Sequence, residues 1–288
     1  MLAWLQNIWQ TLSDTIITAF PLINLLLMVI AGCLGSMLVG KIKEPVRDTL
    51  LRALGLLVIL MGGVELWSGF FVLQTGQFET TGTLLVIFAL LGGYVIGHAL
   101  EMDRTLGRLG NRLFRRFFKK KARPASPARK NGPEPSAVTP PRESVPSAEG
   151  FMLASVICAF SSTTMYSVLE GQLVEDALPL LVRLGFHAVV FFLLAALFGS
   201  GITLAAIPVF AVQGVLLLAG AVCGDLITNT LMNQFRLIGA VLLLAAGIAL
   251  GIGKRVRAAK LIPAYLIPVV YGGVYKLVML FAEKMMAV

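Results

Sequence analysis

The sequence predicts an all-α fold, a polytopic bundle of about eight transmembrane helices, with seven as the alternative. Of the 288 residues, 57% are hydrophobic and only 14% are charged, whereas soluble domains carry roughly 25% charged residues. The mean hydropathy is +0.86. The apolar runs are continuous, and a helix needs about 20 such residues to cross a bilayer. A transmembrane barrel would need strands of alternating polarity, so helices are favoured.

Four regions follow one another along the chain. Residues 1–20 place apolar side chains at helical spacing with polar ones opposite, which predicts an amphipathic helix lying on the membrane surface; a short extra span is the alternative. Residues 21–102 hold a first transmembrane repeat. Residues 103–148 hold a basic cytoplasmic helix and a linker, and residues 149–288 form the second transmembrane half.

Eight apolar segments within these regions are expected to be spans. They cover residues 21–40, 50–70, 82–101, 150–169, 177–198, 203–222, 237–252 and 261–281. The seventh is short for a full crossing of the bilayer.

Lysine and arginine gather in alternate loops. Residues 41–52, 103–149 and 254–260 are rich in basic residues, whereas residues 68–81 and 170–177 have none. Because basic loops stay in the cytoplasm, both termini are expected outside. The net charge of +9 is then explained by topology, and nucleic acid is not an expected partner.

The long basic loop has two parts. Leu106, Leu109, Leu113 and Phe117 recur near helical spacing among arginines, which predicts a basic amphipathic helix on the inner leaflet. It would serve as an anchor or, alternatively, as a lipid sensor. Residues 123–148 are rich in Pro, Ser and Ala, a composition typical of a disordered linker.

Two helix pairs share a spacing. Arg52, Gly55 and Gly63 recur as Arg236, Gly239 and Gly247. The charge rule has the two copies cross the membrane in opposite senses, which predicts an inverted repeat of spans 1–3 and 6–8, as in many secondary transporters. The alternative is that glycines only let helices pack closely. The candidate packing glycines are Gly32, Gly35, Gly55, Gly63, Gly220, Gly224, Gly239 and Gly247.

Short motifs recur in a characteristic order along most of the chain outside the N-terminal helix and the linker. They are Gly35-Ser36, Gly40-Lys41, Pro45-Val46-Arg47-Asp48-Thr49-Leu50, Ala53-Leu54-Gly55, Gly97, Glu101-Met102-Asp103-Arg104, Leu109-Gly110, Glu149-Gly150-Phe151, Ala154-Ser155, Glu170-Gly171, Pro208-Val209, Gln213-Gly214, Gly239 and Leu261-Ile262-Pro263-Ala264. Together they resemble the "domain of unknown function 554" family of bacterial inner-membrane proteins. The resemblance implies a multi-pass protein of the bacterial inner membrane, for which a transport role is commonly suggested.

Three positions depart from the pattern that the resemblance implies. The family usually has Gly-Pro-Met in the fourth span, where this chain has Phe160-Ser161-Ser162. It tends to have an acidic residue at the position of His98 and an aspartate at that of His187. If those acids carry the family's function, this chain has altered or lost it.

Polar and ionisable residues inside predicted spans are candidate site residues, because a charge at bilayer centre costs about 2.5–3.5 kcal/mol. The hypothetical substrate- or ion-binding residues are Ser161, Ser162, Thr163, Thr164, Arg183, His187, Gln213 and Asp225. Arg183 and His187 share one helix face, and Glu170, Glu175 and Asp176 are potential partners of Arg183. His98 and Glu101 form a hypothetical proton relay. Glu65 is expected to reach water. The hydroxyl run is alternatively structural, and the histidine an interfacial hydrogen-bonding group.

Enzyme motifs are absent from the sequence, so an enzyme is not expected. Cys33, Cys158 and Cys223 lie singly in apolar runs, which indicates no metal site, disulfide framework or cofactor.

The leading hypothesis is a secondary transporter of an ion or small polar solute that works by alternating access. The alternative is a non-transporting scaffold or regulator that recruits partners or anionic lipid through its basic cytoplasmic segment. A channel is third, because the spans are too apolar for a wide pore. The expected partners are the lipid bilayer and a small ion or solute, and homo-oligomer formation stays open.

Overall fold

A computed structural model describes residues 2–70, 80–117, 148–174, 178–223, 227–252 and 257–286, and every regular element within them is helical. This confirms the predicted helical membrane bundle. The elements are α1 (Leu2–Ser36), α2 (Glu44–Phe70), α3 (Thr80–Ala99), α4 (Met102–Phe117), α5 (Ala148–Ala159), α6 (Ser162–Val174), α7 (Leu178–Phe198), the 3₁₀ helix η1 (Ser200–Ala205), α8 (Ala206–Cys223), α9 (Asn229–Ile252), the 3₁₀ helix η3 (Ala258–Tyr265) and α10 (Leu266–Met286).

Helices account for each apolar segment. Six stretches are long and apolar enough to cross a membrane, namely Ala19–Ser36, Glu44–Phe70, Leu180–Phe198, Ser200–Val222, Asn229–Ile252 and Ala258–Met279. α3 passes the same test together with α4, from which it is bent by 58°. α5 and α6 follow each other across a break at residues 160–161. The number of membrane crossings, expected to be eight, stays a prediction.

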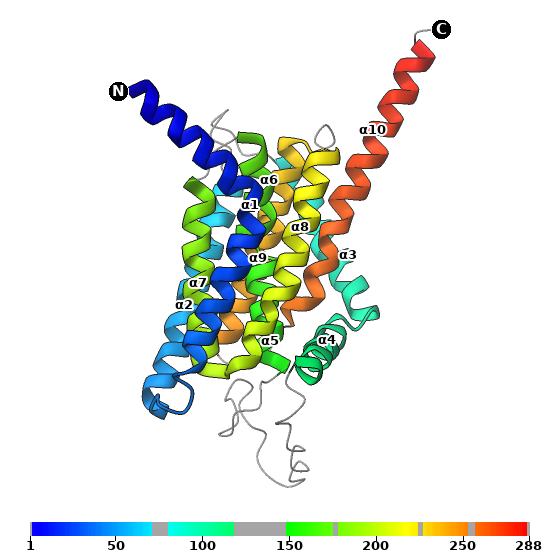
Figure 1. Ribbon diagram of the computed structural model, residues 1–288. Coiled ribbons are helices and arrows are strands. Elements are labelled where there is room, and N and C mark those ends of the chain that lie inside the picture. The colour runs from blue at the N-terminus through cyan, green and yellow to red at the C-terminus, as the bar shows by residue number, and fades with distance from the viewer. Residues whose placement is uncertain are drawn as a thin grey trace.

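The first and seventh spans differ from the expectation. Residues 2–20 do not form a separate helix, because α1 is continuous through Pro21. Proline removes one backbone hydrogen bond and bends a helix without ending it here, and Figure 1 shows α1 change direction as it enters the bundle. α9 begins at Asn229, eight residues before the expected start. Its early polar residues are accommodated because Asn233 donates to the Gly69 carbonyl (2.8 Å).

Two close helix pairs frame the bundle. α2 and α9 lie side by side and antiparallel, since Gly55 lies against Gly251 and Gly69 lies against Leu237. α1 packs on α7, where Gly35 meets the Phe192 carbonyl. Antiparallel packing of α2 and α9 is what an inverted repeat requires, but any antiparallel pair has it. The repeat therefore stays a prediction.

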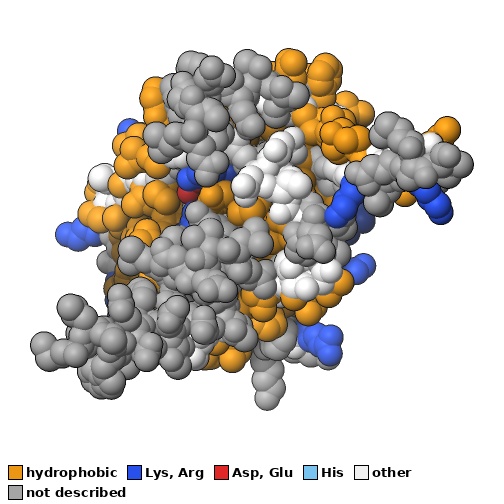
Figure 2. All heavy atoms as spheres, turned by 90° about the horizontal axis from the view of Figure 1, so that it is seen from above, with side chains coloured by type: hydrophobic (Ala, Val, Ile, Leu, Met, Phe, Trp, Pro, Cys, Tyr) orange, Lys and Arg blue, Asp and Glu red, His pale blue; other side chains and the backbone are white. Residues whose placement is uncertain are grey.

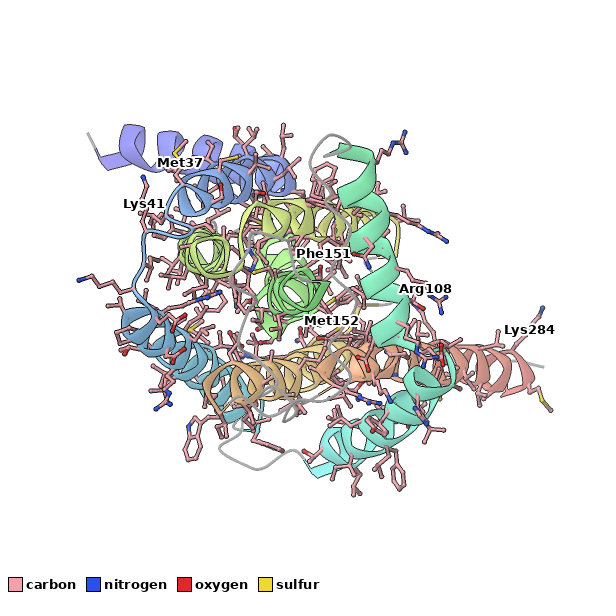
Figure 3. All side chains as sticks on the ribbon, turned by 90° about the horizontal axis from the view of Figure 1, so that it is seen from below. Met37, Lys41, Arg108, Phe151, Met152 and Lys284 are labelled. Carbon is pink, nitrogen blue, oxygen red and sulfur yellow. The ribbon has the colours of Figure 1, made fainter. Side chains whose placement is uncertain are left out.

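The helices α5 and α6 occupy the centre of the bundle. Seen from below, α5 with Phe151 and Met152 is encircled by the other helices (Figure 3). Phe151 is 3% exposed, and Ala154, Ile157 and Cys158 are fully buried. The outer faces are apolar instead, as on α2, where Leu60 is 67% exposed. Seen from above, hydrophobic side chains cover much of the visible periphery (Figure 2), as contact with lipid requires.

The two ends of the bundle differ. Both termini lie at one end, and α4 lies at the opposite end (Figure 1). α4 is the expected basic amphipathic helix: Leu106 is buried, Gly110 packs on the Phe151 ring, and Arg108 and Arg112 are exposed. Most of the expected linker, residues 123–148, lies outside the described residues.

Two glycines of α2 differ in how closely α9 approaches them, and this gives a matched pair of variants. A Cβ at Gly55 would clash with the Gly251 backbone nitrogen, whereas one at Gly63 would meet nothing within 4 Å. Gly62, rather than Gly63, faces α9. Gly55→Ala should destabilise the fold by about 1–3 kcal/mol, as overpacking does. Gly63→Ala should be neutral or slightly stabilising, since alanine favours helix. Thermal unfolding in detergent measures both, and equal effects would contradict this packing.

Candidate functional site

The break between α5 and α6 is held open by hydroxyl groups. The Thr164 hydroxyl donates to the Cys158 carbonyl (2.6 Å) at the end of α5. The Tyr265 hydroxyl donates to the Phe160 carbonyl (2.8 Å). Serine and threonine offer the backbone such alternatives to helical bonding. The backbone therefore leaves the helix for two residues in the middle of the bundle without leaving these carbonyls unpaired.

Buried polar side chains lie at this break and on three helices that contact α5 or α6, and we call them the central polar cluster. Its members are Asn24 on α1, Ser161, Ser162, Thr163 and Thr164 at the break, His187 on α7 and Gln213 on α8, and each is 0% exposed. Four of these seven residues form the hydroxyl run at the break, and a fifth is His187. Asn24 was not foreseen, although it is an amide within an otherwise apolar run.

Direct contacts join three helices of the cluster. His187 Nδ1 lies 3.2 Å from Asn24 Oδ1, so a proton on Nδ1 is donated to the amide oxygen. His187 Nε2 lies 3.5 Å from Thr164 Oγ1. The Thr164 hydroxyl has one proton, and it is donated to the Cys158 carbonyl. The longer contact to Nε2 is therefore weak, and Asn24 is the principal partner of the ring.

Gln213 lies at the level of Asn24. At the lower end of the bundle, Gly32 on α1 packs against Thr203 on η1. From that contact α1 and α8 rise side by side (Figure 1). Asn24 is eight residues further up, which is about 12 Å at 1.5 Å per residue. Gln213 is ten residues further up, which is about 16 Å because the first of these residues belong to a 3₁₀ helix with a longer rise. The two amides thus lie within about one helical turn of each other in depth.

Several polar atoms of the cluster have no partner. Among the described residues, Asn24 Nδ2, Ser162 Oγ and both Gln213 amide atoms, Nε2 and Oε1, are buried without a hydrogen bond. Leaving a buried donor or acceptor unpaired costs about 1–3 kcal/mol. A fold retains such groups where a ligand or water completes them. The arrangement can therefore coordinate a small polar species by hydrogen bonds.

A second polar group lies nearer the end that carries the termini. Glu65 on α2 is 6% exposed and accepts from Arg236 Nε on α9 (2.6 Å), while Arg183 on α7 lies 3.7 Å away. Both guanidinium groups also lie over the Tyr166 ring, at 5.8 Å for Arg183 and 4.6 Å for Arg236. The expectation that Glu65 reaches water is wrong, because these partners make its burial tolerable. Seen from above, a small group of blue and red side chains shows near the middle of the face, and further blue side chains lie toward its edges (Figure 2).

A third polar group lies at the opposite end. Lys260 on η3 is 4% exposed, and its ammonium donates to His98 Nδ1 on α3 (2.8 Å) and lies 5.6 Å from the Tyr94 ring. Glu101 forms the corner between α3 and α4 with a positive φ of 47° and pairs with Arg104. This hydrogen bond lowers the pKa of the Glu101 carboxyl.

The predicted site residues fall into separate places. Ser161, Ser162, Thr163, Thr164, His187 and Gln213 come together in the central polar cluster. Arg183 lies one helical turn away with Glu65, and the Glu170 side chain, Glu175, Asp176 and Asp225 lie outside the described residues. His98 contacts Lys260 and Glu101 contacts Arg104, so the hypothetical relay between His98 and Glu101 stays untested. Lys260 was expected in a basic loop, and only the fold reveals its burial.

Comparison with known proteins gives a family and one relative. Residues 20–272 match the family model described as "Protein of unknown function (DUF554)". The chain is 25% identical over 243 residues to "Uncharacterized membrane protein YdfK" of Bacillus subtilis (strain 168), an alignment that covers 84% of this chain and 90% of that protein. No solved structure matches.

The Glu65 ion pair provides a test of the site's framework. Glu65→Gln should destabilise the fold by about 3–5 kcal/mol, because it leaves the buried Arg183 and the partly buried Arg236 without their carboxylate. Glu101→Gln, which changes an exposed pair, should have little effect. Thermal unfolding in detergent compares the two variants. Equal stability of Glu65→Gln and the unmodified protein would show that the pair is not needed for the fold.

Proposed function

Because the chain belongs to the DUF554 family of proteins of unknown function, we propose a function from its own geometry: secondary transport of an ion or small polar solute by alternating access. The central polar cluster carries this proposal. Secondary transporters bind substrate near the bilayer midplane, at helices broken in mid-membrane. α5 and α6 are such a broken pair.

The unpaired atoms of the cluster support binding rather than a purely structural role. In lipid, backbone and side-chain polar groups must be satisfied within the protein, and each failure is costly. A structural role explains Thr164, whose hydroxyl closes the end of α5. It does not explain Gln213, whose amide is buried and bonds to nothing among the described residues. A transported solute would supply the missing partner.

Polar groups on either side of the cluster support an alternating-access cycle. The Glu65–Arg236 pair lies toward one end, and the Lys260–His98 pair lies toward the other. Through Arg183 the first group also joins α2 to α7, and the second joins η3 to α3. The central polar cluster is 0% exposed, so the conformation is closed to both sides, and loosening these two contacts in turn would expose the cluster alternately.

The proposal includes an orientation in the bacterial inner membrane. α4 and the loop at Lys41 lie at one end of the bundle and the termini at the other (Figures 1 and 3). Basic segments are retained in the cytoplasm, which puts α4 inside and both termini outside.

A second candidate function is supported by α4. Arg104, Arg108 and Arg112 are exposed along it, and Arg108 points away from the bundle in the view from below (Figure 3). A non-transporting scaffold could use this face to recruit partners or anionic lipid. Loss of a bound partner after charge reversal of these arginines, without any flux from the intact protein, would favour the scaffold.

Flux through Gln213 variants tests the transport proposal. Purified protein in proteoliposomes is supplied with a panel of labelled ions and polar solutes, with and without a pH gradient. Gln213→Leu should lower flux by at least ten-fold and leave stability unchanged or higher, because it removes unpaired buried groups. Gln234→Leu is the matched control, since Gln234 is a buried glutamine of α9, 5% exposed, outside the cluster, and its flux should stay near that of the unmodified protein.

A folded protein that moves no solute of the panel would contradict transport. Flux that survives in Gln213→Leu would contradict the role of the central polar cluster while leaving transport itself in place.

Cysteine labelling tests the orientation. In a variant without Cys33, Cys158 and Cys223, single cysteines replace Lys41 or Met285. An impermeant maleimide applied to intact spheroplasts should label Met285→Cys at once and Lys41→Cys only after the membrane is permeabilised. Labelling of both positions from outside would contradict the positions of the termini and the basic loops.

A further inference from the structure

The helix break gives the central polar cluster an electrical polarity. α6 has 13 residues and begins at Ser162, so its amino end lies inside the bundle. A helix amino end carries roughly half a positive charge and has N–H groups without acceptors in the helix. The break therefore exposes donors from the side of α6.

The facing end of α5 does not offset these donors. Its carboxyl end would present carbonyl oxygens, and such oxygens bind cations in transporters. The Cys158 carbonyl already accepts from Thr164. The Phe160 carbonyl already accepts from Tyr265. These two carbonyls are thus occupied, whereas the Ser162 hydroxyl at the start of α6 has no partner among the described residues.

The side chains of the cluster add further unpaired hydrogen-bond donors. The unpaired buried atoms include the donors Asn24 Nδ2 and Gln213 Nε2, and the Ser162 hydroxyl, which can donate. The Gln213 carbonyl Oε1 is the one obligate acceptor among these unpaired atoms of the cluster. None of the cluster's members is a carboxylate, and Glu65, a buried acid of the same bundle, is bound to Arg236. A cation would find little coordination here.

We infer that the central polar cluster binds a small carboxylate anion at the amino end of α6, with Ser162, Asn24 and Gln213 as donors. Half-helix amino ends point at anionic groups of the substrate in transporters with broken helices. The inference rests on the proposed function in taking this anion as the transported solute. The binding site follows from the geometry alone.

Thermal stabilisation by ligands tests the inference without requiring transport. The full chain, purified in detergent, is heated with sodium acetate, lactate, succinate or benzoate, with the primary amide of each acid, and with sodium chloride at equal ionic strength. A ligand that binds only the folded state raises the unfolding midpoint with its concentration. At least one carboxylate should do so, and its amide and sodium chloride should not.

Two serines of similar burial make the test specific. Ser162→Ala should weaken carboxylate binding by about ten-fold or more, because hydrogen bonds to charged groups are the strong ones. Ser155→Ala removes a hydroxyl that is also 0% exposed, but that hydroxyl donates to the Phe151 carbonyl within α5. It should leave the carboxylate affinity unchanged.

Three results would overturn the inference: no stabilisation by any carboxylate, equal stabilisation by the amides, or equal weakening by Ser155→Ala and Ser162→Ala. Carboxylate binding without flux in proteoliposomes would contradict the transport proposal and support the proposed anion-binding site. Flux of a cation or an uncharged solute, with no carboxylate binding, would support the transport proposal and contradict the proposal of an anion site.

Discussion

A polar group in the interior of a lipid-embedded bundle must find its partner within the protein, and this requirement organises the structure. Glu65 is paired with Arg236 across α2 and α9, Lys260 with His98 across η3 and α3, and Tyr265 with the Phe160 carbonyl. Each pairing holds together elements distant in sequence. Against that background the unpaired amide of Gln213 is an exception, and the proposed binding role of the central polar cluster rests on it.

Glycine determines where these pairings can occur. A Cβ at Gly239 on α9 would clash with the Ser162 nitrogen and would lie 2.6 Å from the Tyr265 hydroxyl. A Cβ at Gly97 on α3 would clash with the Lys260 carbonyl oxygen. The missing side chains thus admit the start of α6 and the backbone of η3. Close packing and polar chemistry are therefore two effects of the same glycines.

The sequence predicted the class of the fold and most residues of the central polar cluster, but not the partners of the buried charged residues. Hydropathy reveals apolar runs, and the hydroxyl run at Ser161 and the histidine at position 187 stand out within them. Asn24 was missed, although it is a single amide in an apolar run, as is Gln213, which was predicted. The burial of Glu65 and Lys260 could not be foreseen either, since each depends on partners more than 160 residues away. Long-range pairing is determined by the packing of the helices, and local sequence patterns carry no information about it.

The contacts also suggest which parts would move together in the proposed cycle. α2 and α9 touch along Gly55, Gly62 and Gly69, and α1 lies on α7 through Gly35, in each case with backbone or side chain close to where a Cβ would be. Interfaces packed this closely resist sliding, so each pair behaves as one unit. α5 and α6 contact members of both pairs, and the break lies between them. Rocking of one pair against the other would then act on the break, where the unpaired donors of the central polar cluster lie, and would couple opening to the site itself.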